Sequence, residues 1–188
     1  EKPDDLAPCI MVNDFEASVS ITQHLIDLGH KDIGFIAGEA EHMSTVERLK
    51  GYKQALLDNN IDIDEQLIVQ GTYSFESGVN GAKHLLTCAR KPSAIFSCND
   101  EIAAGALFAA RLMDIKIPEQ LSIAGFEDSP FSRQTWPKLT TAHQPNKKIA
   151  EEAATLLIAQ TRNQSSANFM NQYTPELVVR DSTGKTER

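Results

Sequence analysis

The chain has 188 residues, of which 41% are hydrophobic and 23% charged. This composition supports one folded core, or one core and part of a second, and it excludes a disordered tail. The 18 Lys and Arg residues are outnumbered by 26 Asp and Glu residues, which gives a formal net charge of -8, and no Lys/Arg-rich run occurs. We therefore expect that this chain alone does not bind nucleic acid.

The cysteines and the apolar runs indicate a reducing compartment. Cys9, Cys88 and Cys98 are an odd number without CxxC spacing, and the histidines form no HxxxH pair, so we expect reduced thiols and no metal. No apolar run approaches the roughly 20 residues that span a bilayer, and no basic-then-apolar signal opens the chain. The expected location is the cytoplasm. Residues 1–8 contain no initiator Met, so we expect a processed product or an excised piece.

Short β-rich runs alternate with segments of helical periodicity along the chain. The expected strands are 9–12, 33–38, 67–71, 93–98, 121–126 and 176–180. The expected helices are 15–28, 44–59, 75–88, 100–113 and 146–161. Gly29 is a C-terminal cap of the first helix, and the polar stretch 162–172 is predicted to be a surface loop. The alternation predicts an α/β fold, a parallel sheet covered by helices on both faces.

Polar side chains follow several of the predicted strands. In open parallel sheets, ligands bind beyond the carboxyl ends of the strands. The candidates at that edge are Asn13, Asp14, Tyr73, Asn99, Asp100, Glu127 and Asp128.

Two of these features also have ordinary structural explanations. Asn99 is a preferred N-cap residue, and Asp100 in the first turn favours the helix dipole, although one residue can cap while the other faces a ligand. Ser44 and Glu47 match a capping box, which places Arg48 just beyond the first helical turn. Arg48 is then either an exposed partner of a carboxylate or a planar fork that donates to ligand oxygens.

Enzyme motifs are mostly missing from the sequence. There is no GxSxG elbow, no GxxxxGK[ST] phosphate loop, no GxGxxG and no HExxH. Glu127 and Asp128 are adjacent on an extended segment and point to opposite faces, which weakens a glycosidase interpretation. We expect no catalytic residue and no cofactor, and a cytosolic sugar-processing enzyme is the least favoured reading.

Six stretches occur in an order that resembles the LacI/GalR family of bacterial transcription repressors. They are "HLIDLGHKDIGFIAG", "ERLKGYKQAL", "SAIFSCNDEIAAGAL", "IPEQLSIAGFEDSP", "PKLTTAHQP" and "ELVVRDST". The resemblance covers nearly the whole chain. It implies a three-layer αβα fold of the periplasmic-binding-protein-like type I, with two subdomains around a small effector. It also implies an N-terminal helix-turn-helix headpiece, which this sequence lacks.

The resemblance further implies how the chain is divided. Residues 1–12 match the end of the first subdomain, and 13–137 match the second, effector-binding subdomain. Residues 138–162 match a segment that returns to the first subdomain, and 163–188 match the final strand of the second subdomain with a tail.

The same resemblance implies a binding site and partners. Arg48 matches the effector-binding Arg of the family, Asn99 and Asp100 match its strand-end pair, and Tyr73 matches a pocket aromatic. The remaining implied effector-binding residues are Glu127, which stands where the family usually has Asp, and Gln144 on the hinge side. A sugar is the commoner effector, and a nucleoside or purine is the alternative. The implied partners are a second copy, contacted along 75–88 and 100–113, and operator DNA through the missing headpiece; no membrane is involved. A transport-type sugar-binding protein is a further alternative.

Overall fold

The computed structural model describes residues 9–162 and 170–186. Its centre is a parallel sheet in the order β3-β2-β4-β5, formed by β2 (Ile33–Ile36), β3 (Ile68–Val69), β4 (Ala94–Ser97) and β5 (Ser122–Ala124). Every residue of β2, β4 and β5 is buried, as continuous apolar runs covered on both faces require. In the register, Phe35 of β2 lies beside Phe96 of β4.

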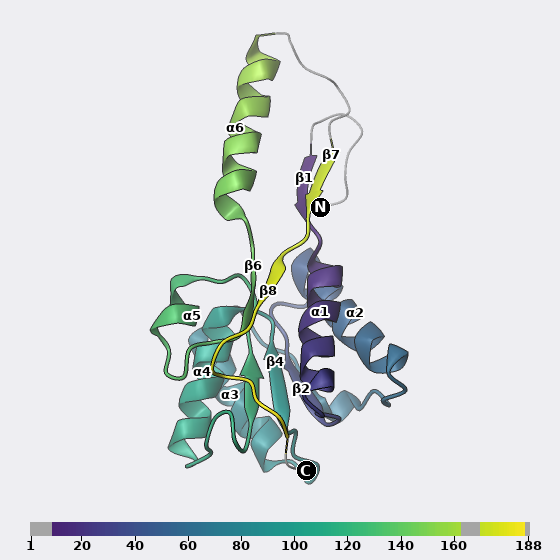
Figure 1. Cartoon of the computed structure of the whole chain (residues 1–188), viewed down its shortest axis with the longest axis vertical. Coiled ribbons are helices and arrows are strands. Elements are labelled where there is room, and N and C mark those ends of the chain that lie inside the picture. Colours follow the sequence, from purple (N-terminus) through teal and green to yellow (C-terminus); the bar gives the residue numbers. More distant parts are fainter. Residues whose placement is uncertain (1–8, 163–169, 187–188) are drawn as a thin grey trace.

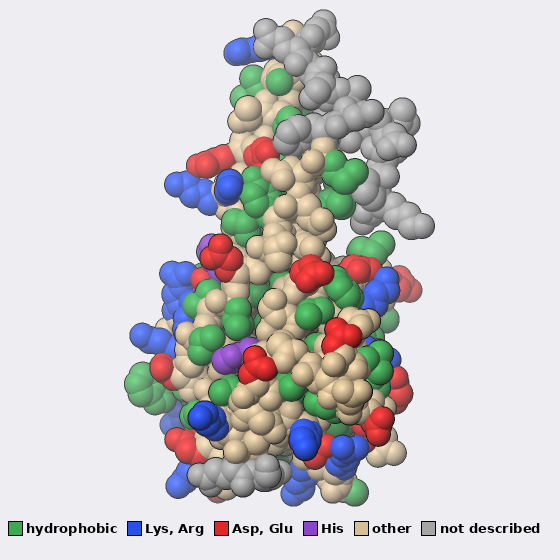
Figure 2. Space-filling view, turned by 45° about the vertical axis from the view of Figure 1, so that its right-hand side comes forward, with side chains coloured by type: hydrophobic (Ala, Val, Ile, Leu, Met, Phe, Trp, Pro, Cys, Tyr) green, Lys and Arg blue, Asp and Glu red, His purple; other side chains and the backbone are tan. Residues whose placement is uncertain are grey.

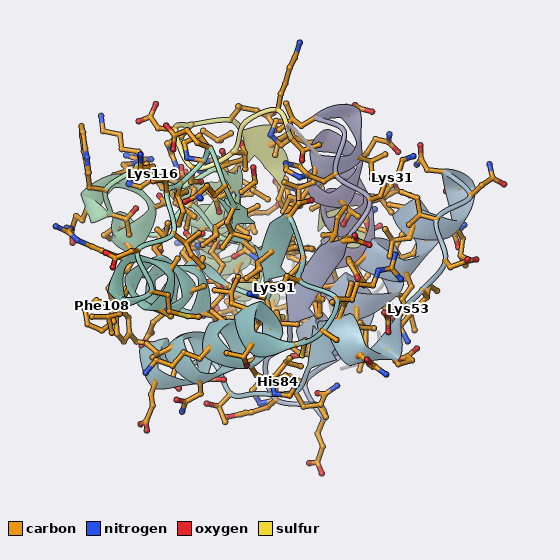
Figure 3. The ribbon with its side chains drawn as sticks, turned by 90° about the horizontal axis from the view of Figure 1, so that it is seen from below. Lys31, Lys53, His84, Lys91, Phe108 and Lys116 are labelled. Carbon is orange, nitrogen blue, oxygen red and sulfur yellow. The ribbon has the colours of Figure 1, made fainter. Side chains whose placement is uncertain are left out.

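Two pairs of helices cover the sheet, one pair on each side (Figure 1). One pair is α1 (Asp14–Asp27) with α2 (Met43–Asp58), and the other is α3 (Phe75–Thr87) with α4 (Asp100–Leu112). Seen from below, Lys53 of α2 and Phe108 of α4 lie on opposite sides of the molecule (Figure 3). A short 3-10 turn, Glu65–Leu67, precedes β3. The α/β fold with helices on both faces is confirmed.

The α3–α4 contact depends on small residues. A Cβ built on Gly105 would run into the backbone carbonyl of Phe75, and one on Gly78 would meet the backbone of Ile102. The two helices therefore approach backbone to backbone. This explains a glycine inside α4, where it costs roughly 1 kcal/mol of helix propensity relative to alanine.

A narrow upper part stands on this broad body (Figure 2). It contains β1 (Cys9–Val12), which pairs in parallel with β7 (Met170–Tyr173), and α6 (Asn146–Thr161), which has no buried residue. Glu152 of α6 accepts hydrogen bonds from Asn171 Nδ2 and from Tyr173 Oη, the latter at 2.6 Å. The helix and the strand pair are thereby held side by side.

Two short strands join the upper part to the body. β6 (Thr141–His143) continues beside β5 through bridges from Ala124 and Glu127, and it pairs antiparallel with β8 (Glu176–Val178). Before β6 the chain forms α5 (Pro130–Gln134) on the outside of α4.

The last described segment, 179–186, runs down the body and ends beneath the sheet. Ser182 Oγ donates to the carbonyl of Ile123 at 2.6 Å and accepts from the amide of Thr140. Buried His30 contacts the hydroxyls of Ser93 and Ser122 and the carbonyl of Gly184, all at about 3 Å. Segment 179–186 is thus fastened at the edge of the sheet opposite to its carboxyl ends.

Most predicted elements are confirmed, with shorter strands than expected. Gly29, at φ +93°, caps α1 as predicted, and the next residue, His30, donates its amide to Leu25. The capping box is wrong: α2 begins at Met43, His42 is the N-cap, and no side chain caps the helix. The predicted loop 162–172 is wrong at its end, where β7 begins at Met170, while residues 163–169 lie outside the described ranges. α5 and β6 were not among the elements predicted from the sequence.

Candidate functional site

The order of the strands places a crevice between β2 and β4. From β2 the chain proceeds outward to β3, and from β3 it returns across β2 to β4, so the connections after β2 and β4 leave the sheet on opposite sides. Ligands in open α/β sheets bind at such a switch point, beyond the carboxyl ends of the strands. The loop before α2 and the junction at Cys98 and Asn99 lie at this crevice.

Arg48 is the centre of the site. Its Nε donates to Asp14 Oδ1 at 2.8 Å, and its Nη1 donates to the carbonyl of Cys98 at 2.6 Å. Glu127 Oε1 lies 3.7 Å from Nη1, and the guanidinium stacks 3.8 Å from the centre of the Phe126 ring. Only 3% of Arg48 is exposed. Burial alone would lower its pKa, but the charge of Asp14 and the other partners raise it, so the group stays cationic.

Asn99 and Asp100 begin α4 directly behind Cys98. Asn99 Oδ1 accepts from the amide of Ile102 at 2.9 Å, which confirms the predicted N-cap and leaves the Nδ2 group outside the cap. Asp100 is fully buried: Oδ1 accepts from Thr141 Oγ1 at 2.6 Å, and Oδ2 accepts from the amide of Ser129 at 2.7 Å. Burial raises the pKa of Asp100 to about 6, against the opposing effect of these hydrogen bonds.

Tyr73 contacts two residues that lie close to Arg48, namely Thr45 and Cys98. Its hydroxyl lies 2.6 Å from Thr45 Oγ1, and Cys98 Sγ lies 3.8 Å from it. The ring packs against Gly38 on one side and stacks with His42, at a centroid distance of 5.4 Å, on another. Burial raises the pKa of Tyr73 to about 12, so its hydroxyl is protonated at neutral pH.

Glu127 and Asp128 lie in a tight turn with φ of +108° and +54°, a region that residues other than glycine rarely adopt. Asp128 holds this turn: its carboxylate accepts from Arg180 at 2.6 Å, from Arg133 at 2.8 Å and from Ser132 at 2.9 Å. Burial opposes ionisation of Asp128, but these donors outweigh it and lower the pKa well below the usual range. Burial raises the pKa of Glu127, against the lowering effect of Arg48.

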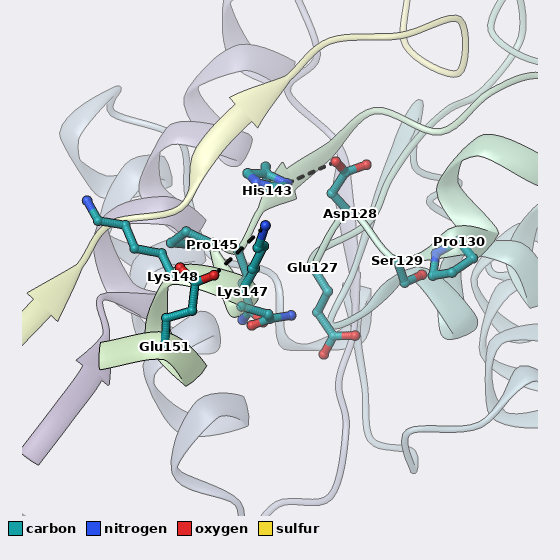
Figure 4. Close-up of a pocket in the computed structure, with 11 residues that line it drawn as sticks. Glu127, Asp128, Ser129, Pro130, His143, Pro145, Lys147, Lys148 and Glu151 are labelled. Carbon is teal, nitrogen blue, oxygen red and sulfur yellow. Dashed lines mark hydrogen bonds and ion pairs between the residues drawn. The ribbon is translucent and has the colours of Figure 1, made fainter. Parts of the chain in front are cut away.

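A cavity of about 600 Å³ opens beside this turn, where the body meets α6 (Figure 4). Glu127, His143, Gln144 and Lys147 contribute to its wall. His143 Nδ1 lies 3.0 Å from Asp128 Oδ2. Gln144 and Glu127 thus line the same cavity.

The structure brings five of the six predicted residues into one cluster at the strand ends. Arg48, Asn99 and Tyr73 surround Cys98, and Asp100 follows Asn99 in the chain. Glu127 contacts Arg48. Gln144 lies outside this cluster, on the wall of the cavity. Their role in binding stays a prediction. The sequence analysis placed Asp14 at this edge without assigning it to the site, and it had no signal for Thr45, which is recognisable only as the residue one helical turn before Arg48.

The arrangement offers hydrogen bonds rather than reaction chemistry. Carboxylate, guanidinium and amide groups each engage adjacent hydroxyls, and hydroxyls both donate and accept. Within residues 9–162 and 170–186 no group of three or more His, Cys, Asp or Glu side chains is arranged to hold a metal ion. No helix in these ranges is long and apolar enough to cross a membrane.

Comparison with known proteins gives a consistent family. Residues 22–183 match the periplasmic binding protein-like domain. The chain is 37% identical to the HTH-type transcriptional regulator DegA of Bacillus subtilis, over 93% of this chain and 51% of DegA. It is 36% identical to the HTH-type transcriptional repressor CytR of Escherichia coli, over 94% of this chain and 52% of CytR. The chain thus spans about half the length of these relatives, which are transcriptional regulators and not enzymes.

Solved structures agree with the sequence comparisons. The transcriptional regulator CelR, solved in complex with cellobiose, superposes with a TM-score of 0.90 at 29% identity, over 96% of this chain and 55% of that chain. The Escherichia coli transcriptional repressor AscG superposes with a TM-score of 0.86 at 30% identity, over 98% of this chain and 66% of that chain. The chain belongs to the periplasmic binding protein-like domain family, in the form carried by LacI-type transcriptional regulators.

Proposed function

We propose that the chain is the effector-binding and dimerisation core of a cytoplasmic LacI-type transcription regulator. A small sugar or sugar derivative binds at the Arg48 cluster and changes the operator affinity of an N-terminal DNA-binding headpiece. A nucleoside or purine effector is the alternative, and a transport-type sugar-binding protein is the third candidate.

The observation that carries the proposal is the set of partners around Arg48. Asp14 and Glu127 fix its guanidinium from two sides, and Phe126 supports its face. The Nη2 group takes part in neither of the hydrogen bonds to Asp14 and Cys98, so it is the donor that we assign to an effector oxygen. A buried guanidinium whose charge is balanced by carboxylates supplies direction rather than net charge, which suits a neutral polyol.

We assign the upper part to a first subdomain. The support is that α6 has no buried residue and that Leu157, Ile158 and Met170 are more than half exposed. Exposed apolar side chains on a helix and an adjacent strand pair favour a covering layer. On this assignment β7 is grouped with β1 and α6, and residues 174–186 return to the body. The cleft between the two subdomains then has the Arg48 cluster on one wall.

We assign the dimer contact to the outer face of α3, α4 and α5. Aromatic side chains gather there: Phe75 and Phe108 are in ring contact at 5.7 Å, and Phe131 and Trp136 are 43% and 83% exposed. Large exposed aromatics with an interspersed Arg are typical of the centres of protein interfaces. Arg111 lies in this patch, on the walls of two adjoining grooves that also share Trp136.

A thermal-shift screen tests the effector site. The full-length product of the gene that encodes this chain is heated with sugars, sugar phosphates, nucleosides and purines. A compound at about 100 times its dissociation constant adds about 2.7 kcal/mol of stability. We expect one class to raise Tm, and we expect Arg48→Ala to remove the shift. The control is Arg90→Ala, because Arg90 also pairs with two carboxylates, Asp32 and Asp64, but is half exposed.

The outcome of the screen separates the candidates. A sugar hit supports the first reading, and a nucleoside or purine hit supports the second. A shift that persists in Arg48→Ala contradicts the site, and no shift with any compound contradicts both effector readings. Operator binding that responds to the hit separates a regulator from a transport protein.

Sedimentation equilibrium tests the dimer contact. We expect Phe108→Glu to shift the protein from dimer to monomer, because a charge in the centre of an apolar interface has no partner. Leu57→Glu is the matched control, since Leu57 is 55% exposed against 46% for Phe108 but lies on α2. An unchanged dimer in Phe108→Glu contradicts the assignment.

A further inference from the structure

The ring of Tyr73 is covered by the protein itself. A Cβ built on Gly38 would lie 2.5–2.8 Å from three atoms of this ring, so the ring packs directly against the glycine backbone. The imidazole of His42 stacks with the same ring, with an angle of 29° between the planes. The Tyr73 hydroxyl is engaged by Thr45 at 2.6 Å. Tyr73 is therefore fixed by contacts at both its ring and its tip, and it is only partly exposed.

His42 lies on the same row as the residues that build the site. His42, Thr45 and Arg48 follow one another at intervals of three residues, which places them along one side of α2 and its entrance. Arg48 is buried at the inner end of this row, Thr45 holds Tyr73 in the middle, and His42 is at the outer end with 57% of its side chain exposed. Glu39 Oε2 contacts His42 Nε2 at 2.9 Å.

We propose that His42, and not Tyr73, presents the aromatic surface that contacts the effector. This inference rests on the proposed function. Tyr73 stacks against the inner face of the imidazole and holds it in place. Tyr73 itself is held by its contacts with Gly38 and Thr45. Glu39 sets the position of the ring from its edge. The outer face of His42 then covers an apolar C–H face of a sugar or the plane of a base, while Arg48 takes the oxygens.

The arrangement makes His42 a determinant of specificity. The imidazole adds polar edge atoms to a flat surface, unlike a phenyl ring, so it selects effectors that have a hydroxyl or amide beside an apolar face. Replacing His42 should change which compounds bind without disturbing the contacts of Arg48, because the two side chains are six residues apart and share no hydrogen bond.

Proton–carbon NMR of the histidine rings tests the inference on the full-length product, with cellobiose and cytidine as probes. The His42 signal is assigned by its loss in His42→Gln. Without a probe, Tyr73→Leu should move this signal, because the ring current of Tyr73 is removed. With the probe that raises Tm, the His42 signal should shift and the His84 signal should not. His42→Ala should weaken the affinity for that probe about tenfold. His84 is an exposed histidine on α3, and His84→Ala should leave the affinity within twofold of the unaltered protein.

Each other outcome overturns the inference. An unmoved His42 signal in Tyr73→Leu shows that the rings are not stacked in solution. Equal affinity of the probe for His42→Ala and the unaltered protein shows that His42 makes no contact, while the proposed function stands. If neither probe nor any other compound of the thermal-shift screen raises Tm, the proposed function and the inference fail together.

Discussion

Replacing Asp100 with Asn should change how the stability of the protein depends on pH. The carboxyl of Asp100 is fully buried, and its pKa is raised from 3.8 to about 6, chiefly by desolvation. A shift of about 2 units corresponds to about 3 kcal/mol, at about 1.4 kcal/mol per unit. The protonated form is favoured in the folded state, so this contribution is fully present below pH 3.8 and is lost as the pH rises through about 6.

Asparagine cannot ionise, so it removes this dependence. Asp100→Asn also loses one acceptor for Ser129 or Thr141, and that cost does not vary with pH. We expect the free energy of unfolding of Asp100→Asn, minus that of the unaltered protein, to rise by about 3 kcal/mol between about pH 4 and pH 7. Urea titrations followed by circular dichroism measure it.

The control for this experiment is Asp62→Asn, an exposed carboxylate in the loop after α2. The free energy of unfolding of Asp62→Asn, minus that of the unaltered protein, should not change between about pH 4 and pH 7. A flat difference for Asp100→Asn as well would refute the reasoning, since it would mean that water or a rearranged Thr141 solvates the carboxylate in the folded state.

Substitutions at three further positions test the helix packing, the N-cap of α4 and a buried hydrogen bond by denaturant unfolding. Gly105→Ala should destabilise by about 1–3 kcal/mol, because the added methyl meets the backbone of α3, and a gain in stability would show that the helices can separate. Asn99→Ala should cost about 1 kcal/mol through loss of the cap to Ile102, whereas Asn99→Asp should retain most of it. Tyr52→Phe should cost about 1 kcal/mol, because Tyr52 donates to the carbonyl of Ile33 at 2.7 Å in the core; an unchanged midpoint would show that this carbonyl finds another donor.

The sequence predicted the body well because its signals are local. Each central strand is a short apolar run, and Gly29 and Asn99 are capping residues whose backbone role does not depend on distant parts of the chain. The rule that ligands bind at the carboxyl ends of parallel strands then selected Asn99, Asp100 and Glu127 without knowledge of the strand order. Arg48 was identified instead from its position in the predicted helix and from the family resemblance.

The parts that the sequence did not predict depend on distant contacts. β7 is polar, "MNQY", and it becomes a strand because β1, far earlier in the chain, supplies its ladder. Ser44 matched a capping box, but α2 begins earlier, at Met43, with His42 at the N-cap position, where its ring stacks with the distant Tyr73. The covering of Tyr73 by Gly38 and His42 had no sequence signal, because the loop between β2 and α2 meets the loop between β3 and α3 there.

The fastening of segment 179–186 beneath the sheet has a consequence for synthesis. The body is completed by a segment that is synthesised after all strands of its sheet, because Ser182 bridges Ile123 and Thr140 and Gly184 accepts from His30. Until that segment emerges, the buried hydroxyls of Ser93 and Ser122 lie at an unfinished edge. A stop codon just before residue 179 would therefore leave the body with an unfinished edge, although the deleted segment lies at the edge of the sheet opposite to the Arg48 cluster.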